Sequence, residues 1–365
     1  MNLPKIKPEP DNKRFVQTIR GEIKPNRPPF CELFLDQEHM IAICEEGLGR
    51  TWVPMLDDRE SRERYWDNVI AVYYALGYDY IRALGVPLSF PGKRRQADAP
   101  GRDGKLRSWT EEDAGVITTR REYEEYEWPE FDERSICDFE YISTHLPEGM
   151  GIVMCPSSGF LEVPMNQLLG YTSMCYLLED DPELVTDVFD AVGRRILDYY
   201  KKIVSLKIPN LFGFFQGDDM GYKSATLISP KDMSRLALKW HKRLARLAHD
   251  NDMVYMLHSC GNLEEIMEEL IDDVKIDAKH SFEDEIMPVT DFHMKYGDRI
   301  CVLGGIDVDK MCRYEPAELR AYIRGTLDCC MPRGRYALGS GNSVTNYIPL
   351  QSYFLMLEEG WNYGK

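Results

Sequence analysis

Short apolar runs alternate with longer amphipathic stretches along most of the chain. Eight of these runs are bounded by polar, Gly or Pro residues and have the length of buried strands. They span residues 29–35, 79–84, 151–155, 210–216, 254–259, 276–281, 300–304 and 335–339. Eight strands that alternate with helices, with a right-handed crossover after each strand, predict an α/β protein with a closed parallel (β/α)8 fold, a TIM barrel. A doubly wound open sheet is the main alternative.

The stretches between the apolar runs carry helix-start signals. Asp181 and Ser229 are residue types that cap helix N-termini, and each is followed by a proline at the first helical position, where a missing N–H costs nothing. The pattern predicts helices that begin at these two caps and extend to Ile203 and His249. Further helices are expected over residues 263–272, 315–327 and 349–362.

Two segments do not follow this alternation. Residues 1–27 form a polar, Pro-rich lead-in with one expected helix around residues 12–21, and residues 28–365 form the predicted barrel. Residues 86–135, after the second expected strand, are rich in Gly, Pro, Arg and aromatic residues, and residues 104–129 within them fit a hairpin followed by a helix start. A long insertion after a barrel strand lies on the face where active sites sit. The insertion is therefore a lid or partner surface, or else a surface embellishment.

Composition narrows the classes of partner and compartment. The chain has 365 residues, and 44 Lys+Arg against 61 Asp+Glu give it a net charge of −17. Such a balance disfavours nucleic acids and anionic membranes, and the basic triplet at residues 93–95 is too short to counter it. No apolar stretch is long enough for a membrane span, and the N-terminus lacks the apolar core of a signal peptide. We therefore expect a cytoplasmic protein whose ten cysteines, with no CxxC pair among them, are reduced thiols.

His258 and Cys260 give the sharpest chemical signal. They end the fifth apolar run, in MLHSCGN, and side chains two residues apart on a strand point to the same face. An imidazole and a thiolate placed in this way can bind one Zn²⁺ at about 2.0–2.3 Å. Two ligands are fewer than the three that a catalytic zinc site takes from protein, so a core cysteine beside a hydrogen-bonded histidine is the alternative interpretation.

Carboxylates and a second histidine follow neighbouring runs. Adjacent side chains on a strand diverge, so one of Asp218 and Asp219 is expected to face the pocket while the other anchors a loop; we assign Asp218 to acid–base catalysis and Asp219 to substrate binding. His280 is a candidate general acid or base, with a purely structural pairing as the alternative, and Glu283 is a candidate metal ligand.

Polar residues at three other run ends are candidates for binding substrate. They are Glu32 in the first run, Asp307 after a Gly-Gly turn, and Asn342 in the Gly-rich end of the last run. Glycines at such places allow a ligand to approach the backbone closely, although they also occur in ordinary turns.

An ordered series of motifs resembles the uroporphyrinogen decarboxylase superfamily. The series is GDDMGYKSATLISP, then MLHSCGN, then GGID, then a Gly-rich strand end followed by a helix that closes in WNYG. The resemblance covers residues 210–365 well and implies a (β/α)8 barrel. True decarboxylases of this superfamily carry an Arg-rich N-terminal segment and an Asp soon after the second strand. Here RPPFCELFLDQEH has only Arg27, and IRALGVPL has no Asp, so uroporphyrinogen decarboxylation is disfavoured.

The other branch of the superfamily consists of cobalamin-dependent methyltransferases that bind Zn through an HxC pair and a later cysteine. His258 and Cys260 match the pair, but Asn342 stands near the place of the later cysteine, so the remaining ligand should be a carboxylate, with Glu283, Asp218 and Glu32 as candidates. The resemblance implies zinc-dependent methyl transfer between a small methoxy compound or thiol and a corrinoid cofactor on a partner protein, by a monomer or homodimer. A decarboxylase of another small carboxylated substrate and a non-catalytic corrinoid- or tetrapyrrole-binding barrel are the alternatives.

Overall fold

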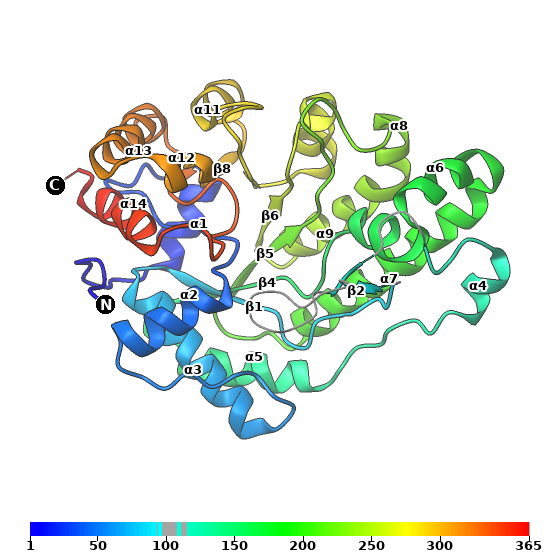
Figure 1. Cartoon of the computed structure of the whole chain (residues 1–365), viewed down its shortest axis with the longest axis horizontal. Coiled ribbons are helices and arrows are strands. Elements are labelled where there is room, and N and C mark those ends of the chain that lie inside the picture. The colour runs from blue at the N-terminus through cyan, green and yellow to red at the C-terminus, as the bar shows by residue number, and fades with distance from the viewer. Residues whose placement is uncertain (93, 97–107, 111–114, 365) are drawn as a thin grey trace.

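Parallel strands form one curled sheet at the centre of the molecule. The computed structural model describes residues 1–92, 94–96, 108–110 and 115–364. Within them the sheet has seven strands in the order β1-β4-β5-β6-β7-β8-β9, all paired in parallel. The strands are β1 Tyr80–Ala83, β4 Gly151–Met154, β5 Leu211–Gly217, β6 Val254–His258, β7 Ala278–His280, β8 Cys301–Leu303 and β9 Tyr336–Ala337. The prediction of a parallel α/β protein with a TIM-barrel-like arrangement is confirmed (Figure 1).

The first apolar run, expected to be the first of the eight strands, is not a regular strand. It makes only isolated parallel bridges, Phe30 with Leu338 and Leu35 with Val344. On its other side the run contacts β1 through a side chain of that strand: Arg82 Nη1 donates to the carbonyl oxygen of Leu33 at 3.2 Å. Pro29 opens the run and Pro28 precedes it, and neither has an N–H to donate to a ladder. The prediction of eight regular strands is therefore wrong at this run.

Helices surround the sheet (Figure 1). The two predicted caps are confirmed: Asp181 accepts a hydrogen bond from the N–H of Leu184 at 3.0 Å, and Ser229 from that of Asp232 at 3.1 Å. The helix expected over residues 263–272 is broken into a 3₁₀ turn, the short α10 Met267–Glu269 and a π turn. The other helices are α2 Gln37–Ala42, α3 Arg59–Ala75, α4 Arg120–Glu125, α5 Arg134–His145, α6 Tyr171–Asp180, α7 Pro182–Ser205, α8 Pro230–Met233, α9 Lys239–His249, α11 Val289–Tyr296, α12 Val308–Arg313, α13 Pro316–Cys330 and α14 Leu350–Asn362.

Apolar side chains fill both faces of the sheet. A large cluster packs between the strands and the outer helices, and a smaller one fills the concave inside. The predicted lead-in helix is confirmed as α1 Asn12–Arg20, and it contributes Phe15 and Ile19 to the inner cluster. The ring of Phe15 lies 5.0 Å from that of Tyr80 on β1. Because α1 begins beside the turn that precedes β4, where Asn12 N–H donates to Gly149 O at 2.8 Å, it closes the N-terminal end of the sheet.

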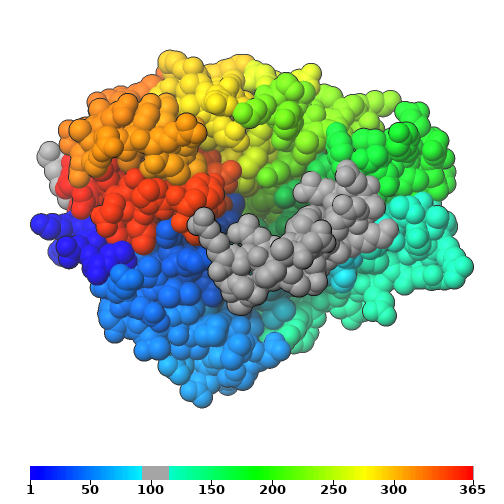
Figure 2. All heavy atoms as spheres, viewed as in Figure 1, coloured from blue at the N-terminus to red at the C-terminus, as the bar shows by residue number. Residues whose placement is uncertain are grey.

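The insertion leaves the sheet between β1 and β4. Its described part contains an antiparallel pair, β2 Arg94–Gln96 with β3 Ser108–Thr110, followed by α4. Of the segment expected to form a hairpin and a helix start, residues 104–107 and 111–114 lie outside the described residues, as does the first residue of the basic triplet. No helix within the described part of the chain is long and apolar enough to cross a membrane. Figure 2 shows the N-terminal residues, in blue, at the surface beside the C-terminal helices in red and orange, where Leu3 and Phe354 line one surface pocket.

Candidate metal centre and adjoining pocket

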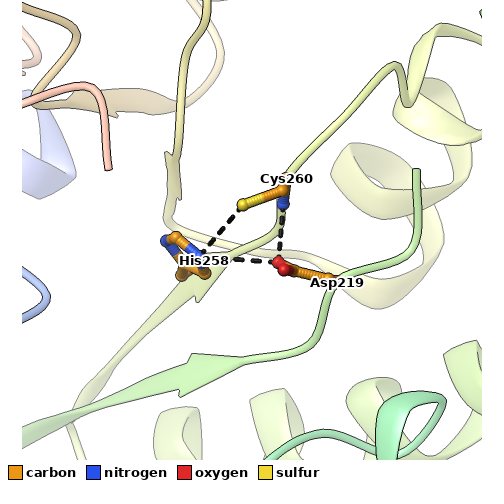
Figure 3. Close-up of side chains that lie close together, drawn as sticks. All are labelled: Asp219, His258 and Cys260. Carbon is orange, nitrogen blue, oxygen red and sulfur yellow. Dashed lines mark hydrogen bonds and ion pairs between the residues drawn. The ribbon is translucent and has the colours of Figure 1, made fainter. Parts of the chain in front are cut away.

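Three potential metal ligands meet at the carboxyl ends of β5 and β6. Val254 and Met256 on β6 point into the inner cluster, and strand alternation places His258 on the same face. The Nε2 atom of His258 lies 3.5 Å from Cys260 Sγ and 3.5 Å from an oxygen of Asp219 (Figure 3). The ligand atoms of the three side chains all lie within 4.8 Å of one another. They form the only such group of three or more His, Cys, Asp and Glu residues within the described ranges.

Glycines allow the two loops that carry these residues to touch. Gly221 N–H donates to Cys260 O at 3.1 Å, and Asn262 N–H donates to Tyr222 O at 2.7 Å. Gly261 has a φ of +83°, and a Cβ atom there would lie 2.2 Å from the backbone of Gly221. A side chain at position 261 would therefore push the Asp219 loop away from Cys260.

His280 on β7 fixes the protonation pattern of His258. Its Nε2 lies 3.1 Å from Ser340 O, and since a carbonyl oxygen only accepts, His280 donates there. Burial, together with the neighbouring His258, holds the pKa of His280 well below its usual value, so this ring is neutral. Nδ1 of His280 then accepts a hydrogen bond from the Nδ1–H group of His258, at 2.7 Å. When His258 is neutral, its lone pair is therefore on Nε2, the atom that faces Asp219 and Cys260.

Two side chains donate to the sulfur of Cys260. Asn342 Nδ2 lies 3.3 Å and Ser281 Oγ 3.4 Å from Sγ. The Asn342 oxygen accepts from Ser343 N–H at 2.8 Å, so the amide nitrogen is the atom that points at the sulfur. Burial and the charge of Asp219 raise the pKa of Cys260 to about 12. Donors aimed at a buried sulfur stabilise its thiolate form, which is the form that binds metal.

The donor set fits a catalytic zinc ion. In the metal-free protein burial by itself would raise the pKa of Asp219, but a hydrogen bond from protonated His258 Nε2 and one from the Cys260 backbone hold it at about 2, so the carboxylate is ionised. Metal binding would displace that proton from Nε2. One imidazole nitrogen, one sulfur and one carboxylate oxygen make three protein ligands, which leaves a fourth tetrahedral position for substrate or water. A single carboxylate in place of a second sulfur makes such a site harder and more Lewis-acidic.

Asp219 is the carboxylate of this group, in place of the three expected candidates. Asp218 is fully buried and faces the loop after β4, where it accepts from the N–H groups of Leu161 and Glu162 at 2.9–3.0 Å. It also pairs with the buried His241 at 2.7 Å. The expectation that one Asp faces the pocket and its neighbour anchors a loop is confirmed. The assignment of Asp218 to acid–base catalysis is not supported, because its oxygens are already occupied by these partners.

The remaining sequence-predicted residues occupy different positions. Glu32 is fully buried, and Ser340 takes both of its oxygens, through N–H at 2.8 Å and Oγ at 2.5 Å. Asp307 caps α12 by accepting from Lys310 N–H at 3.1 Å, and it lines a separate acidic pocket with Glu283. Glu32, Asp307 and Glu283 therefore lie outside the group around His258. Their expected roles, substrate binding for the first two and metal binding for Glu283, stay predictions that the geometry of this group does not support. Asn342 borders both pockets.

A pocket of about 430 Å³ adjoins Asp219 and His258. Its walls combine apolar and polar side chains: Leu33, Phe34, Arg82, Leu84, Pro87, Cys155, Pro156, Ser157, Ser158, Glu162, Gly217, Asn342 and Ser343. Arg82 and Glu162 are the charged residues here that sequence reasoning missed. Burial and the charges of Asp218 and Asp219 raise the pKa of Glu162 to about 8. For Arg82, a charged residue inside an apolar run was the available signal.

The fold and site together define a TIM-barrel-like α/β protein with a polar pocket at the carboxyl ends of its strands, where active sites of this architecture lie. The model of the uroporphyrinogen decarboxylase (URO-D) family matches residues 163–360, more than half of the chain. The chain belongs to this family. No curated protein matches it. Family membership supports a decarboxylase or a methyltransferase-like enzyme and does not separate the two.

Proposed function

We propose that the protein is a zinc-dependent methyltransferase that moves a methyl group between a small substrate and a corrinoid cofactor on a partner protein. The observation that carries the proposal is the group of Asp219, His258 and Cys260, in which the free lone pair of His258 faces a carboxylate and a sulfur. These three residues would hold the ion. Bound there, zinc would supply Lewis acidity, either to polarise the oxygen of a methyl ether or to lower the pKa of a thiol.

The residues around the group support this chemistry. Asn342 and Ser281 hold the Cys260 sulfur by hydrogen bonds, and His280 keeps the His258 ring oriented. The apolar wall formed by Leu33 and Phe34 suits the carbon skeleton of a small substrate. A pocket of about 430 Å³ is at the small end of ligand sites, which run from about 300 to 1,000 Å³. It suits a single-ring molecule better than a corrin, in keeping with a corrinoid carried on a separate protein.

Metal analysis of the purified protein tests the proposal directly. We expect about one zinc per chain in the unmodified protein and almost none in His258→Ala, since two remaining ligands hold zinc poorly. His249→Ala is the matched control, because this histidine is on the outer helix α9 and pairs with Asp277 at 2.8 Å. The zinc-loaded protein, incubated with methylcobalamin and thiols or with reduced cobalamin and methoxy compounds, should change the cobalt absorbance. Absence of stoichiometric metal from the unmodified protein would refute the zinc assignment.

Replacing His280 by Phe should weaken zinc binding about 10- to 100-fold without removing a ligand. The phenyl ring fills a similar volume but accepts no proton from His258 Nδ1, so the His258 ring loses its fixed orientation. Competition with a chromophoric zinc chelator measures the affinity. His249→Phe serves as the control, and its affinity should match that of the unmodified protein. Equal affinities for all three proteins would show that His280 does not position the ligand.

Decarboxylation of a small carboxylated substrate is the second candidate. It is favoured by Glu162, a carboxyl group that lines the same pocket and holds a proton at neutral pH. Such a group can protonate the carbanion left when carbon dioxide departs. Carbon dioxide release that is lost in Glu162→Gln would favour this candidate, and methyl transfer to or from cobalt would favour the first. Binding of corrinoid with neither reaction would indicate a non-catalytic barrel.

A further inference from the structure

Arg82 lines the pocket from β1, the strand at one edge of the sheet. It is on β1, two residues after Tyr80, whose ring lies in the inner apolar cluster. Strand alternation therefore directs Arg82 to the inside of the sheet as well, one layer nearer to the carboxyl ends. It lines the pocket together with Asp219 and His258, and β4 and β5 lie between β1 and β6 in the sheet.

The guanidinium has no anionic partner among the described residues. It donates from Nη1 to Leu33 O at 3.2 Å, and it also makes a hydrogen bond with the side chain of Cys155. Its other neighbours are the ring of Phe34, at 5.7 Å, and the sulfur of Cys155. Nε of Arg82 is buried and has no hydrogen-bond partner. By contrast, the buried Arg62 forms a fork with both oxygens of Asp138. A guanidinium without such a partner is costly to bury, and a bound anion would offset that cost.

The free edge of the guanidinium has the shape of a carboxylate site. Nη1 of Arg82 donates to Leu33 O and the buried Nε has no hydrogen-bond partner, so Nε can donate to a ligand along the edge that it forms with Nη2. This edge matches the two oxygens of a carboxylate, whereas an alcohol or an amide oxygen satisfies only one of the two donors. The acidic side chains that line the same pocket do not fill the place: Asp219 pairs with His258, and Glu162 makes no ion pair with Arg82.

We infer that Arg82 binds the carboxylate of a small substrate whose other end reaches Asp219, His258 and Cys260. The inference rests on the proposed function and adds the substrate class: a compact, single-ring or similar carboxylate that carries the reacting group away from its anionic end. The apolar residues Leu84, Pro87 and Pro156 line the pocket together with these polar groups and suit the carbon skeleton. Arg82 is thus a residue that determines specificity for an anionic substrate.

Binding of matched ligand pairs to the full-length, zinc-supplemented protein tests this role. The pairs are acetate and acetamide, benzoate and benzamide, and 4-methoxybenzoate and 4-methoxybenzamide, which differ in charge but hardly in shape. We expect at least one carboxylate to bind more tightly than its amide by calorimetry. In Arg82→Met that carboxylate should bind about 10- to 100-fold more weakly, while the amide changes little. Arg82→Lys should bind the carboxylate with intermediate affinity, because it keeps the charge but loses the fork.

Arg246→Met is the control variant, since Arg246 is an exposed residue of α9 that pairs with Asp250. Thermal unfolding of every variant checks that the fold is intact, and Arg82→Lys keeps the test open if Arg82→Met does not fold. The inference is overturned if the unmodified protein binds no carboxylate better than its amide at millimolar concentrations, or if both Arg82 variants bind carboxylates as the unmodified protein does. These readings need no turnover, so a failure of methyl transfer with carboxylate binding intact would count against the proposed function alone.

Discussion

Asp218→Ala is expected to destabilise the fold by about 3–5 kcal/mol, because it leaves buried partners without their acceptor. The two backbone N–H groups of Leu161 and Glu162 and the ring of His241 all donate to this carboxylate in a fully buried place. His241 in turn contacts the hydroxyl of Tyr255 at 2.6 Å, so the loss extends along a chain of buried polar groups. For a chain of this length the melting temperature should fall by about 4–6 °C.

Asp219→Ala is the matched control for that experiment. The Asp219 side chain is 41% exposed and its partners are the groups that would bind metal, so its removal should cost little stability in the metal-free protein. It should instead abolish stoichiometric zinc binding. We therefore expect Asp218→Ala to lower the stability of the fold and Asp219→Ala to remove zinc binding. If Asp218→Ala melted within a degree of the unmodified protein, the buried network would not stabilise the fold as described.

Glu32→Gln is expected to stabilise the protein at alkaline pH and to have little effect near pH 5. Burial raises the pKa of Glu32 to about 8, above the 4.5 of an unperturbed glutamate. The hydrogen bonds around Glu32 also indicate a neutral carboxyl group, because Ser340 Oγ lies 2.5 Å from Glu32 Oε2 and 2.5 Å from Asn342 O. The carbonyl oxygen only accepts, so the hydroxyl of Ser340 donates to Asn342 O and accepts a hydrogen bond from the carboxyl group of a neutral Glu32.

The sign of the pH dependence follows from this raised pKa. Between pH 4.5 and 8 the unfolded chain releases a proton that folded Glu32 retains, so stability falls as pH rises through that window, by at most about 5 kcal/mol. Glutamine keeps the hydrogen bonds and has no proton to lose. Denaturant unfolding at pH 5 and pH 8.5 measures the difference, with the exposed Glu38→Gln as control. Equal stability differences at the two pH values would show that Glu32 is ionised in the folded state.

The sequence predicted the elements better than the contacts between them. Strand-like runs and proline-marked caps depend on local patterns, which is why Asp181 and Ser229 were placed correctly. The first run deviated because its pairing with Leu338 depends on residues that are distant in sequence. In the site, His258 and Cys260 could be paired from a spacing of two, but the choice of Asp219 over Glu283 depended on how two loops touch through glycines. The role of Arg82 could not be predicted, because the sequence does not show which side chains surround a charged residue within an apolar run.

The packing of α1 has a consequence for how the chain folds. Phe15 and Ile19 complete the inner cluster with Leu303 and Ala337, and Arg335 donates to Ile19 O at 3.1 Å. Because α1 lies near the N-terminus and β8 and β9 follow residue 300, the helix is synthesised well before the strands against which it packs. Contacts of such large sequence separation are associated with slow folding, because chain entropy is lost before the contacts form. We expect α1 to dock late in folding and the inner apolar cluster to remain open to solvent until β8 and β9 have joined the sheet.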